Sequence, residues 1–378
     1  MVGQTTGKPG APSPDADFSQ ADNRRVSMAI KAAVIGAGQV AQQHLACLST
    51  LPGVTAAGVC DLSRAVAECA ADRHGVAAWY TDHVRMLAEV RPDVVHITTP
   101  PASHFRLARD CMEAGAHVFV EKPATVNLEE FTALQALASA KGRMFIEDYN
   151  YLYNEPVRRL TDWINQGVLG SVVHVEVFLC LNILEKDNPF VDPNVRHPAL
   201  DLSGGAIADF LPHMASLVHH FCGTVTSVRT TWEKRTLRSP LPYDEFRALL
   251  RSPRATAALN FSSNSQPDVF RATAFGSLGR ATADIFENRL TCALMRSGYK
   301  PLIPLYNALD EAKQLRRSAW KLLWSKLSGG PGAYEGLWTL IRKVYESVSS
   351  GSPPPISPAD MLEVNRLIDN LKKEENRL

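Results

Sequence analysis

A glycine-rich segment, Gly36-Ala37-Gly38-Gln39-Val40-Ala41, stands directly between an apolar run and a helical stretch. Glycines in such a turn let the backbone approach a pyrophosphate closely, and the helix N-terminus that follows offers N–H donors and a favourable dipole. Asp61 ends the next apolar run, 20 residues after Ala41, where a carboxylate can accept hydrogen bonds from ribose hydroxyls. We therefore expect Gly36, Gly38, Gln39, Val40 and Asp61 to bind a dinucleotide. The alternative is a glycine turn that only packs helix on strand, with Asp61 as a helix cap.

The choice between NAD and NADP depends on two neighbouring side chains. Asp61 repels a 2′-phosphate and so favours NAD, whereas Arg64 could accommodate that phosphate. We expect NAD as the cofactor, with NADP as the alternative.

Two further motifs follow apolar runs and point to one edge of the expected sheet. The segment from Thr98 to His104 reads TTPPASH, and Glu121-Lys122-Pro123 follows the run at His117–Val120. Open α/β sheets bind ligands at the carboxyl ends of their strands. We expect Thr99, Pro100, Glu121 and Lys122 to line the cofactor crevice, where Lys122 could stabilise a developing alkoxide. Taken alone, Lys122 is more simply a solvated loop lysine. His104 is either a direct ligand or a surface residue that starts the next helix behind a Ser103 cap.

A fourth motif runs from Gly204 to His213 and places Asp209 and His213 four residues apart. On a helix these two side chains share one face. A carboxylate beside an imidazole can orient the ring and raise its basicity, which makes His213 a candidate base for an alcohol proton. Pro212 inside this helix costs stability or kinks it, which indicates a shaped site. The alternative is a surface pair of little consequence.

Apolar runs and helical stretches alternate from Ile30 to about Asn150. Such repeats of strand and helix build a parallel sheet through right-handed crossovers. We expect a Rossmann domain over residues 29–150, preceded by a disordered tail over residues 1–28 that is rich in Gly, Pro, Ser and Asp. The expected strands are Ile30–Ile35, Val54–Cys60, Val94–Thr98, His117–Val120 and Met144–Glu147, and the expected helices are Gln39–Thr50, Arg64–His74, Ser103–Ala114 and Leu128–Lys141.

The pattern changes after residue 150. Val172–Leu181 alternates strictly between apolar and polar residues, which is typical of a half-buried strand in an antiparallel sheet. Hairpins are expected around Ser252-Pro253 and around Gly276–Gly279. We expect an α/β protein in which residues 151–378 form a C-terminal α+β domain with an open, mostly antiparallel sheet.

The segment Tyr306–Leu327 combines cations with large apolar side chains. A basic amphipathic helix that carries tryptophans can lie on a membrane. We expect the more common arrangement, in which the apolar face packs against the protein or at a subunit interface, and keep membrane contact as the alternative. The cations are Lys313, Arg316, Arg317, Lys321 and Lys326, and the apolar residues are Leu315, Trp320, Leu323, Trp324 and Leu327.

Composition narrows the classes of function. A formal net charge of +1 gives no reason to expect a nucleic-acid partner. The seven cysteines are odd in number and form no CxxC pair, so we expect no disulfide framework and no metal site, and place the protein in the cytoplasm. The sequence also lacks an apolar run of about 18 residues, the length that a spanning helix needs.

Taken together, the order and spacing of GAGQVA, TTPPASH, EKP and the Gly204–His213 motif resemble those of the Gfo/Idh/MocA family over about residues 30–225. This family includes glucose–fructose oxidoreductase-like and inositol dehydrogenase-like enzymes. The resemblance implies NAD(P)-dependent oxidation or reduction of a sugar, nucleotide sugar or cyclitol. It also implies a homodimer or homotetramer, since the C-terminal sheet domain of this family often forms oligomer contacts.

Carried over by motif, Lys122, Asp209 and His213 match the catalytic residues of the family. In the implied mechanism, His213 removes a hydroxyl proton, Lys122 stabilises the alkoxide and the hydride passes to the nicotinamide, while Asp209 orients one of the other two. Leu211 and Ser216 differ from the family's usual pattern, and so does Leu152, which replaces the arginine that usually follows the last Rossmann strand. We therefore expect an unusual substrate pocket, lined by Tyr151, Arg196 and His197.

Two other activities fit the same motifs. A redox-assisted lyase or glycosidase would oxidise a sugar transiently, eliminate a substituent and reduce the product with the same NAD. A non-catalytic NAD-binding sensor would bind the cofactor without turnover, but the presence of Lys122, Asp209 and His213 argues against it.

Overall fold

The structure is a computed structural model that describes residues 29–185, 188, 190–192, 197–236, 241–296, 298, 300–327 and 332–373. The expected tail over residues 1–28 and the expected pocket residue Arg196 therefore lie outside the described residues.

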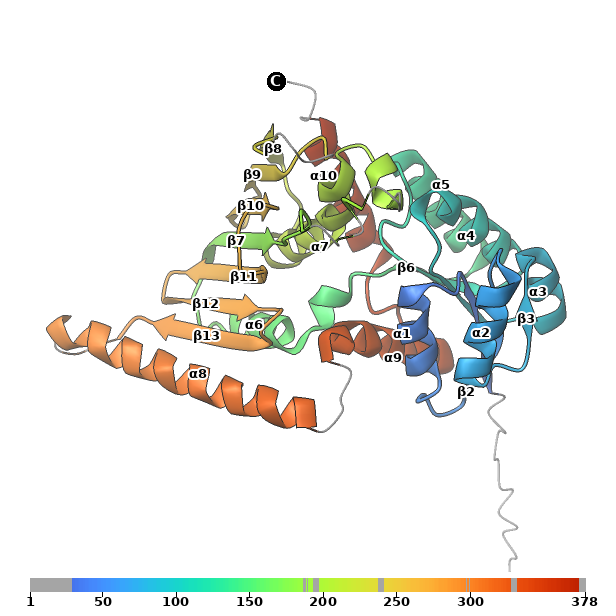
Figure 1. Ribbon diagram of the computed structural model, residues 1–378. Coiled ribbons are helices and arrows are strands. Elements are labelled where there is room, and N and C mark those ends of the chain that lie inside the picture. Colours follow the sequence, from blue (N-terminus) through green and yellow to red (C-terminus); the bar gives the residue numbers. More distant parts are fainter. Residues whose placement is uncertain are drawn as a thin grey trace, which may run out of the picture.

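The first sheet is parallel throughout, with the strand order β3-β2-β1-β4-β5-β6 (Figure 1). The order reverses between β1 and β4, so the carboxyl ends of these strands flank the crevice where open α/β sheets bind ligands. This confirms the expected Rossmann sheet, but the two-residue strand β3 is too short to be predicted from the sequence. The strands are β1 (Ile30–Ile35), β2 (Val54–Cys60), β3 (Trp79–Tyr80), β4 (Val94–Ile97), β5 (His117–Val120) and β6 (Phe145–Glu147).

Five helices connect the strands of the first sheet. Asp82 caps α3 by accepting hydrogen bonds from the backbone of Val84 and Arg85, and Asn127 caps α5 through Glu130. All five helices bury apolar residues, as expected of helices that cover a parallel sheet. They are α1 (Gln39–Leu48), α2 (Arg64–His74), α3 (His83–Val90), α4 (His104–Glu113) and α5 (Leu128–Lys141).

The second sheet has the strand order β13-β12-β11-β7-β10-β9-β8 and is antiparallel except between β7 and β10. This confirms the expected open, mostly antiparallel sheet. The two edge strands, β8 and β13, were not anticipated. The strands are β7 (Val172–Cys180), β8 (Ser227–Glu233), β9 (Glu245–Arg251), β10 (Thr256–Ser262), β11 (Val269–Gly276), β12 (Gly279–Asp284) and β13 (Arg289–Leu294).

Helix α7 (Gly205–Cys222) is almost wholly buried between the two sheets and stays continuous through Pro212. It packs on β7 and β10, while α6 (Glu155–Asn165) packs on β12 and β13. Because α7 carries the fourth sequence motif, this packing brings that motif to the carboxyl edge of the first sheet.

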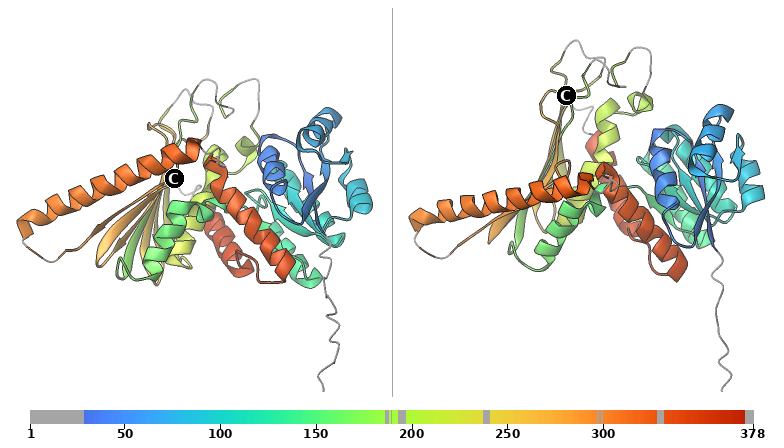
Figure 2. Two further views of the ribbon diagram at one scale, coloured as in Figure 1. Left: turned by 90° about the horizontal axis from the view of Figure 1, so that it is seen from below. Right: turned by 60° about the horizontal axis from the view of Figure 1, so that its bottom comes forward.

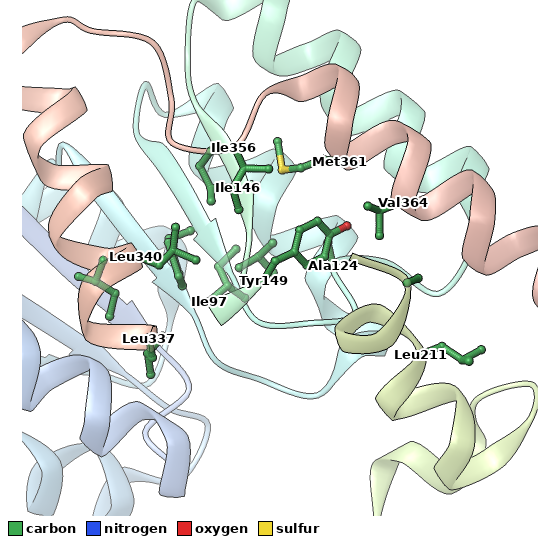
Figure 3. Packing of buried hydrophobic residues seen from close by; sticks show 14 of the residues in the cluster. Ile97, Ala124, Ile146, Tyr149, Leu211, Leu337, Leu340, Ile356, Met361 and Val364 are labelled. Atoms are coloured by element: carbon green, nitrogen blue, oxygen red, sulfur yellow. The ribbon is translucent and has the colours of Figure 1, made fainter. Parts of the chain in front are cut away.

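The two C-terminal helices return to the N-terminal half of the chain. Helix α9 (Glu335–Ser350) packs on α1, and α10 (Pro358–Lys373) packs on α5, α7 and β6. Figure 3 shows Leu340 of α9, Met361 of α10 and Tyr149 after β6 in one continuous core. Helices α9 and α10 therefore help to fix the edge of the first sheet.

Helix α8 (Ile303–Leu327) lies along β13, at the margin of the second sheet, and extends past the ends of its strands (Figures 1 and 2). Its largest apolar side chains are exposed, so the expectation that they pack against the protein's own body is wrong. No helix in the described ranges is long and apolar enough to cross a membrane. Short 3-10 turns complete the fold at Pro101–Ser103, Asn150–Tyr153, Pro198–Asp201, Lys300–Leu302 and Gly332–Tyr334.

Candidate active site

The glycine loop between β1 and α1 leaves room for a ligand. Gly36 has a φ of 91°, and a Cβ atom there would lie 2.8 Å from the carbonyl carbon and oxygen of Thr98. A Cβ atom on Gly38 would meet nothing within 4 Å, and no side chain caps the α1 N-terminus, where Gln39 and Val40 begin the helix. The first glycine is therefore required by the fold, whereas the second keeps open the space where a pyrophosphate could meet helix N–H groups.

Asp61 follows β2 and faces the glycine loop. Its carboxylate accepts hydrogen bonds from the backbone N–H groups of Ala37 and Ser63, both at 2.9 Å. The side chain thus stabilises the loop and the start of α2 at once. Arg64 instead pairs with Glu68 at 3.6 Å and stacks 5.1 Å from the Trp79 ring centre. The residues of this loop fit NAD, because the Asp61 carboxylate lies where it could accept hydrogen bonds from the adenosine ribose.

His104 connects two of the predicted loops from inside the protein. Its side chain is fully buried, with one ring nitrogen 2.7 Å from the carbonyl oxygen of Thr99 and the other 2.9 Å from that of Pro123. Burial lowers the pKa of His104, although the two carbonyls act in the opposite direction. His104 is thus not the predicted surface residue, because its ring ties the loop of Thr99 and Pro100 to the loop of Lys122.

Lys122 and Asp209 meet across the two halves of the chain. The Lys122 Nζ lies 2.8 Å from the Asp209 carboxylate and 3.1 Å from the Asp209 backbone oxygen. Both side chains are largely buried, with exposed fractions of 16% and 14%. Of the two partners considered for Asp209 from the sequence, Lys122 and His213, the structure places its carboxylate on Lys122.

His213 lies one helical turn after Asp209 and is buried. Its ring packs edge-on against Tyr151 with 4.5 Å between ring centres, and its Nδ1 has no hydrogen-bond partner among the described residues. Burial, together with the nearby charge of Lys122, holds the pKa of His213 well below its usual value. The imidazole is therefore neutral near pH 7 and free to accept a proton.

The two described pocket residues lie beside this group. Tyr151 packs between His213 and Phe270, and burial raises its pKa to about 12. His197 packs against Phe190 with 4.1 Å between ring centres. Burial lowers the pKa of His197, the charge of Asp209 raises it, and the charge of Lys122 lowers it further. Both residues are thus placed where they could contact a substrate held at Lys122.

A buried chain of polar side chains leads to Glu121, the residue before Lys122. His44 lies 2.9 Å from the Glu121 carboxylate and 2.8 Å from His96, which in turn lies 3.0 Å from the Tyr345 hydroxyl. His44, His96 and Tyr345 were not predicted from the sequence, because they lie on α1, β4 and α9, whose contact is decided only by packing. The one available signal was that β4 carries a histidine, His96, within an otherwise apolar strand.

Asp148 was also missed, although it directly follows β6 at the same edge of the sheet. Burial, followed by the charge of Glu121, raises the pKa of Asp148 well above its usual value. Burial acts on Glu121 as well, but the bond from His44 and the charge of Lys122 bring its pKa below normal. The two neighbouring carboxyl groups are therefore shifted in opposite directions, with the pKa of Asp148 raised and that of Glu121 lowered, beside the charge of Lys122.

Both halves of the chain match models of one protein family. Residues 30–149 match the model described as "Oxidoreductase family, NAD-binding Rossmann fold", and residues 157–282 match the "GFO/IDH/MocA C-terminal domain".

Individual proteins resemble the chain over shorter stretches. Glycosyl hydrolase family 109 protein 2 of Akkermansia muciniphila is 35% identical over 158 residues, which cover 39% of this chain and 33% of that protein. D-glucoside 3-dehydrogenase of Escherichia coli (strain K12) is 31% identical over 147 residues, which cover 39% of this chain and 42% of that protein. The match thus spans less than half the length of either relative.

A solved structure resembles nearly the whole fold. The WlbA dehydrogenase from Bordetella pertussis, in complex with NADH and UDP-GlcNAcA, has a TM-score of 0.75 at 17% sequence identity, covering 92% of this chain and 96% of that chain. This likeness shows a shared fold. Together with the two family models, it leads to one conclusion: the chain belongs to the Gfo/Idh/MocA oxidoreductase family, with an N-terminal NAD-binding Rossmann domain and the C-terminal domain of that family.

Proposed function

We propose that the protein is an NAD-dependent oxidoreductase that transfers a hydride between the nicotinamide and a hydroxyl or keto carbon of a sugar, nucleotide sugar or cyclitol. The observation that carries this proposal is the Lys122–Asp209 ion pair beside the neutral, buried His213 at the carboxyl edge of the Rossmann sheet. A D-glucoside dehydrogenase among the relatives and a nucleotide-sugar dehydrogenase among the structural neighbours support this class of substrate.

Each residue has a distinct part in the proposed reaction. A bound NAD supplies the acceptor for the hydride. His213 accepts the hydroxyl proton, because its imidazole is neutral. Lys122 donates a hydrogen bond to the substrate oxygen and stabilises the charge that develops there. Asp209 is a positioning residue that holds the ammonium group of Lys122 through its carboxylate and its backbone oxygen.

Several chain residues would hold the cofactor. Gly36, Gly38 and the first turn of α1 would bind the pyrophosphate, and Asp61 would accept hydrogen bonds from the adenosine ribose. Thr99 and Pro100 follow β4, Glu121 follows β5, and all three would line the nicotinamide side of the crevice. NADP would require Arg64 to leave Glu68 and Trp79, so we propose NAD as the natural cofactor.

The test is a panel assay with the full-length protein. Free sugars, glucosides, nucleotide sugars and cyclitols are each supplied with NAD and then with NADP, and formation of the reduced cofactor is followed by its absorbance. We expect NADH formation with one substrate class and weaker or no activity with NADP. If no substrate of the panel changes the cofactor and the products are also unchanged, the proposal is wrong.

A second candidate is the redox-assisted lyase or glycosidase, which the 35% identical glycosyl hydrolase relative favours. This activity would cleave a substituent from the sugar with no net formation of NADH. Product analysis of the same panel distinguishes the two, since cleavage without net NADH assigns the second activity.

The proposal also covers the cellular location and the oligomeric state of the protein. We propose that the protein acts in the cytoplasm, which its seven free cysteines support, and that it forms a homodimer or homotetramer through the open sheet of the second domain. Light scattering of the purified protein would give the oligomeric state directly.

A further inference from the structure

Helix α8 turns its polar side toward the protein. The side chain of Gln314 accepts a hydrogen bond from the Cys292 N–H at 2.7 Å and donates one to the Cys292 carbonyl at 3.0 Å, while Asp310 pairs with Arg296. A cavity of about 470 Å³ lies between α8, β13 and α6. Every residue that α8 contributes to this cavity is polar: Asn307, Asp310, Gln314, Arg317, Ser318 and Lys321.

The opposite side of α8 is apolar and exposed. Five large side chains follow one another at separations of four, eleven, three and one residues, so at about 100° per residue they fall within about 100° of one another around the helix. Ala312 and Arg316 occupy the two intervening turns. The five residues, which we call the α8 apolar face, are Leu305, Leu309, Trp320, Leu323 and Trp324, with exposed fractions of 52%, 58%, 61%, 48% and 68%.

This orientation is the reverse of that of an ordinary surface helix. Such a helix directs its apolar stripe to the core and its polar side to water. A contiguous exposed apolar patch usually marks a surface that contacts a partner or a membrane. Figures 1 and 2 show α8 at the margin of the molecule, with its N-terminal part beyond the strands, so a broad surface could reach the helix along its length.

The positive charge on α8 indicates which kind of surface could cover the α8 apolar face. From Ala312 to Leu327 the sequence has five cations and no carboxylate. Lys313 and Arg316 lie on the same side as the α8 apolar face, and within the described ranges neither has an ion-pair partner. The covering surface must therefore be apolar and negatively charged at once.

A second copy of α8 does not meet this requirement. Packed antiparallel about its middle, it would oppose Lys313, Arg316 and Arg317 with the same three cations. Packed in parallel, it would oppose each cation with itself. Like charges held together in this way destabilise a helix pair.

We propose that α8 attaches the protein to the surface of an anionic phospholipid bilayer. Trp320 and Trp324 are suited to the interfacial region, where amphipathic aromatic rings accumulate. Lys313 and Arg316 can extend their long side chains to the headgroup phosphates while the apolar face enters the acyl boundary. The helix lies in the plane of the interface and does not span the bilayer, in keeping with the composition of the described helices.

The test is sedimentation of the full-length protein with two kinds of vesicle. One contains phosphatidylcholine and phosphatidylserine, and the other contains phosphatidylcholine alone. We expect sedimentation with the anionic vesicles at low salt, little with the neutral ones, and release in high salt because screening weakens the headgroup contacts. The emission of the exposed tryptophans should shift to shorter wavelength on binding.

Two variants separate the apolar and electrostatic contributions. Trp320→Ser/Trp324→Ser should weaken partitioning by about tenfold or more and remove the emission shift. Lys313→Ala/Arg316→Ala should weaken it by about fivefold for each cation. The matched control Arg229→Ala/Arg251→Ala removes two exposed cations of the second sheet and should bind like the wild type. Equal NAD binding and thermal midpoints would show that all variants remain folded.

Two outcomes would overturn the proposal. One is wild-type protein that stays in the supernatant with anionic vesicles. The other is wild-type protein whose sedimentation equals that of both α8 variants. If light scattering then shows an oligomer that the tryptophan variant dissociates, the occupant of the α8 apolar face is a second copy of the chain.

Discussion

Two lysine–carboxylate pairs in this protein occupy opposite environments. Lys122 and Asp209 join the two halves of the chain at the Rossmann edge, with exposed fractions of only 16% and 14%. Lys321 and Glu155 join α8 to α6, with exposed fractions of 53% and 24%. The residue types are nearly the same, but water screens only the second pair effectively.

This difference in burial suits only the Lys122–Asp209 pair to the proposed chemistry. A largely buried ammonium group interacts strongly with nearby charge and with a developing alkoxide, because little water competes for it. It also lowers the pKa of the neighbouring His213. A pair whose lysine is more than half exposed gains little energy and perturbs its neighbours little. Burial, rather than residue type, thus separates a candidate catalytic group from a surface contact.

The largest expected effect comes from Lys122→Ala. Removal of the ammonium group should lower kcat by about 10²–10³-fold with little change in the Kd for NAD, because the lost hydrogen bond is directed at the reacting oxygen. Steady-state kinetics and NAD titration measure both quantities. Lys122→Ala also removes the ion-pair partner of Asp209, which could destabilise the fold. Thermal unfolding of Lys122→Ala and of Lys122→Arg, which retains the positive charge, measures that loss of stability separately. Full turnover by Lys122→Ala would refute the assignment.

The next effect contrasts two glycines in the cofactor loop. Gly36→Ala forces a Cβ atom against Thr98 at a positive φ, so we expect a loss of about 1–3 kcal/mol in unfolding free energy together with weaker NAD binding. Gly38→Ala meets no neighbour, so it should keep the thermal midpoint while weakening NAD binding by about tenfold or more. Unchanged NAD affinity in Gly38→Ala would argue against pyrophosphate binding at this turn.

The depressed pKa of His213 predicts a pH dependence of stability. Below the ordinary histidine pKa of about 6.5, the unfolded chain binds a proton that folded His213 does not bind. The free energy of unfolding should therefore fall as the pH drops from 7 to 5, with His213 contributing up to about 1.4 kcal/mol per pH unit. Denaturant titrations at several pH values should give a shallower slope for His213→Asn. The control His174→Asn removes a histidine of the second sheet, and an equal change in slope there would contradict the assignment.

The smallest expected effect is that of Lys321→Ala. Because this lysine is more than half exposed, its loss should change the free energy of unfolding by no more than about 1 kcal/mol and leave kcat unaltered. Thermal unfolding and the activity assay check both expectations. An effect on kcat comparable to that of Lys122→Ala would remove the contrast between the two regions.

Most of the first domain could be predicted because its signals are local. Gly36 and Gly38 precede the predicted helix, and the strands Ile30–Ile35, Val54–Cys60 and His117–Val120 have the same bounds in the sequence prediction and in the structure. Strand β3 and the edge strands β8 and β13 escaped prediction, since short or marginal strands carry too little periodicity to stand out.

The sequence by itself determined the Rossmann sheet and the open second sheet, because turns and hydrophobic periodicity act over a few residues. Its motifs also predicted the cofactor loop and the catalytic roles of Lys122, Asp209 and His213, which stay predictions. Only the tertiary structure decided that Asp209 pairs with Lys122 rather than with His213, that His104 braces two loops from inside, and that Asp148 lies against Glu121. It also decided that α8 exposes its apolar side. These outcomes depend on which surfaces meet when distant segments of the chain pack together. The residue pattern of one segment does not specify which other segment will pack against it.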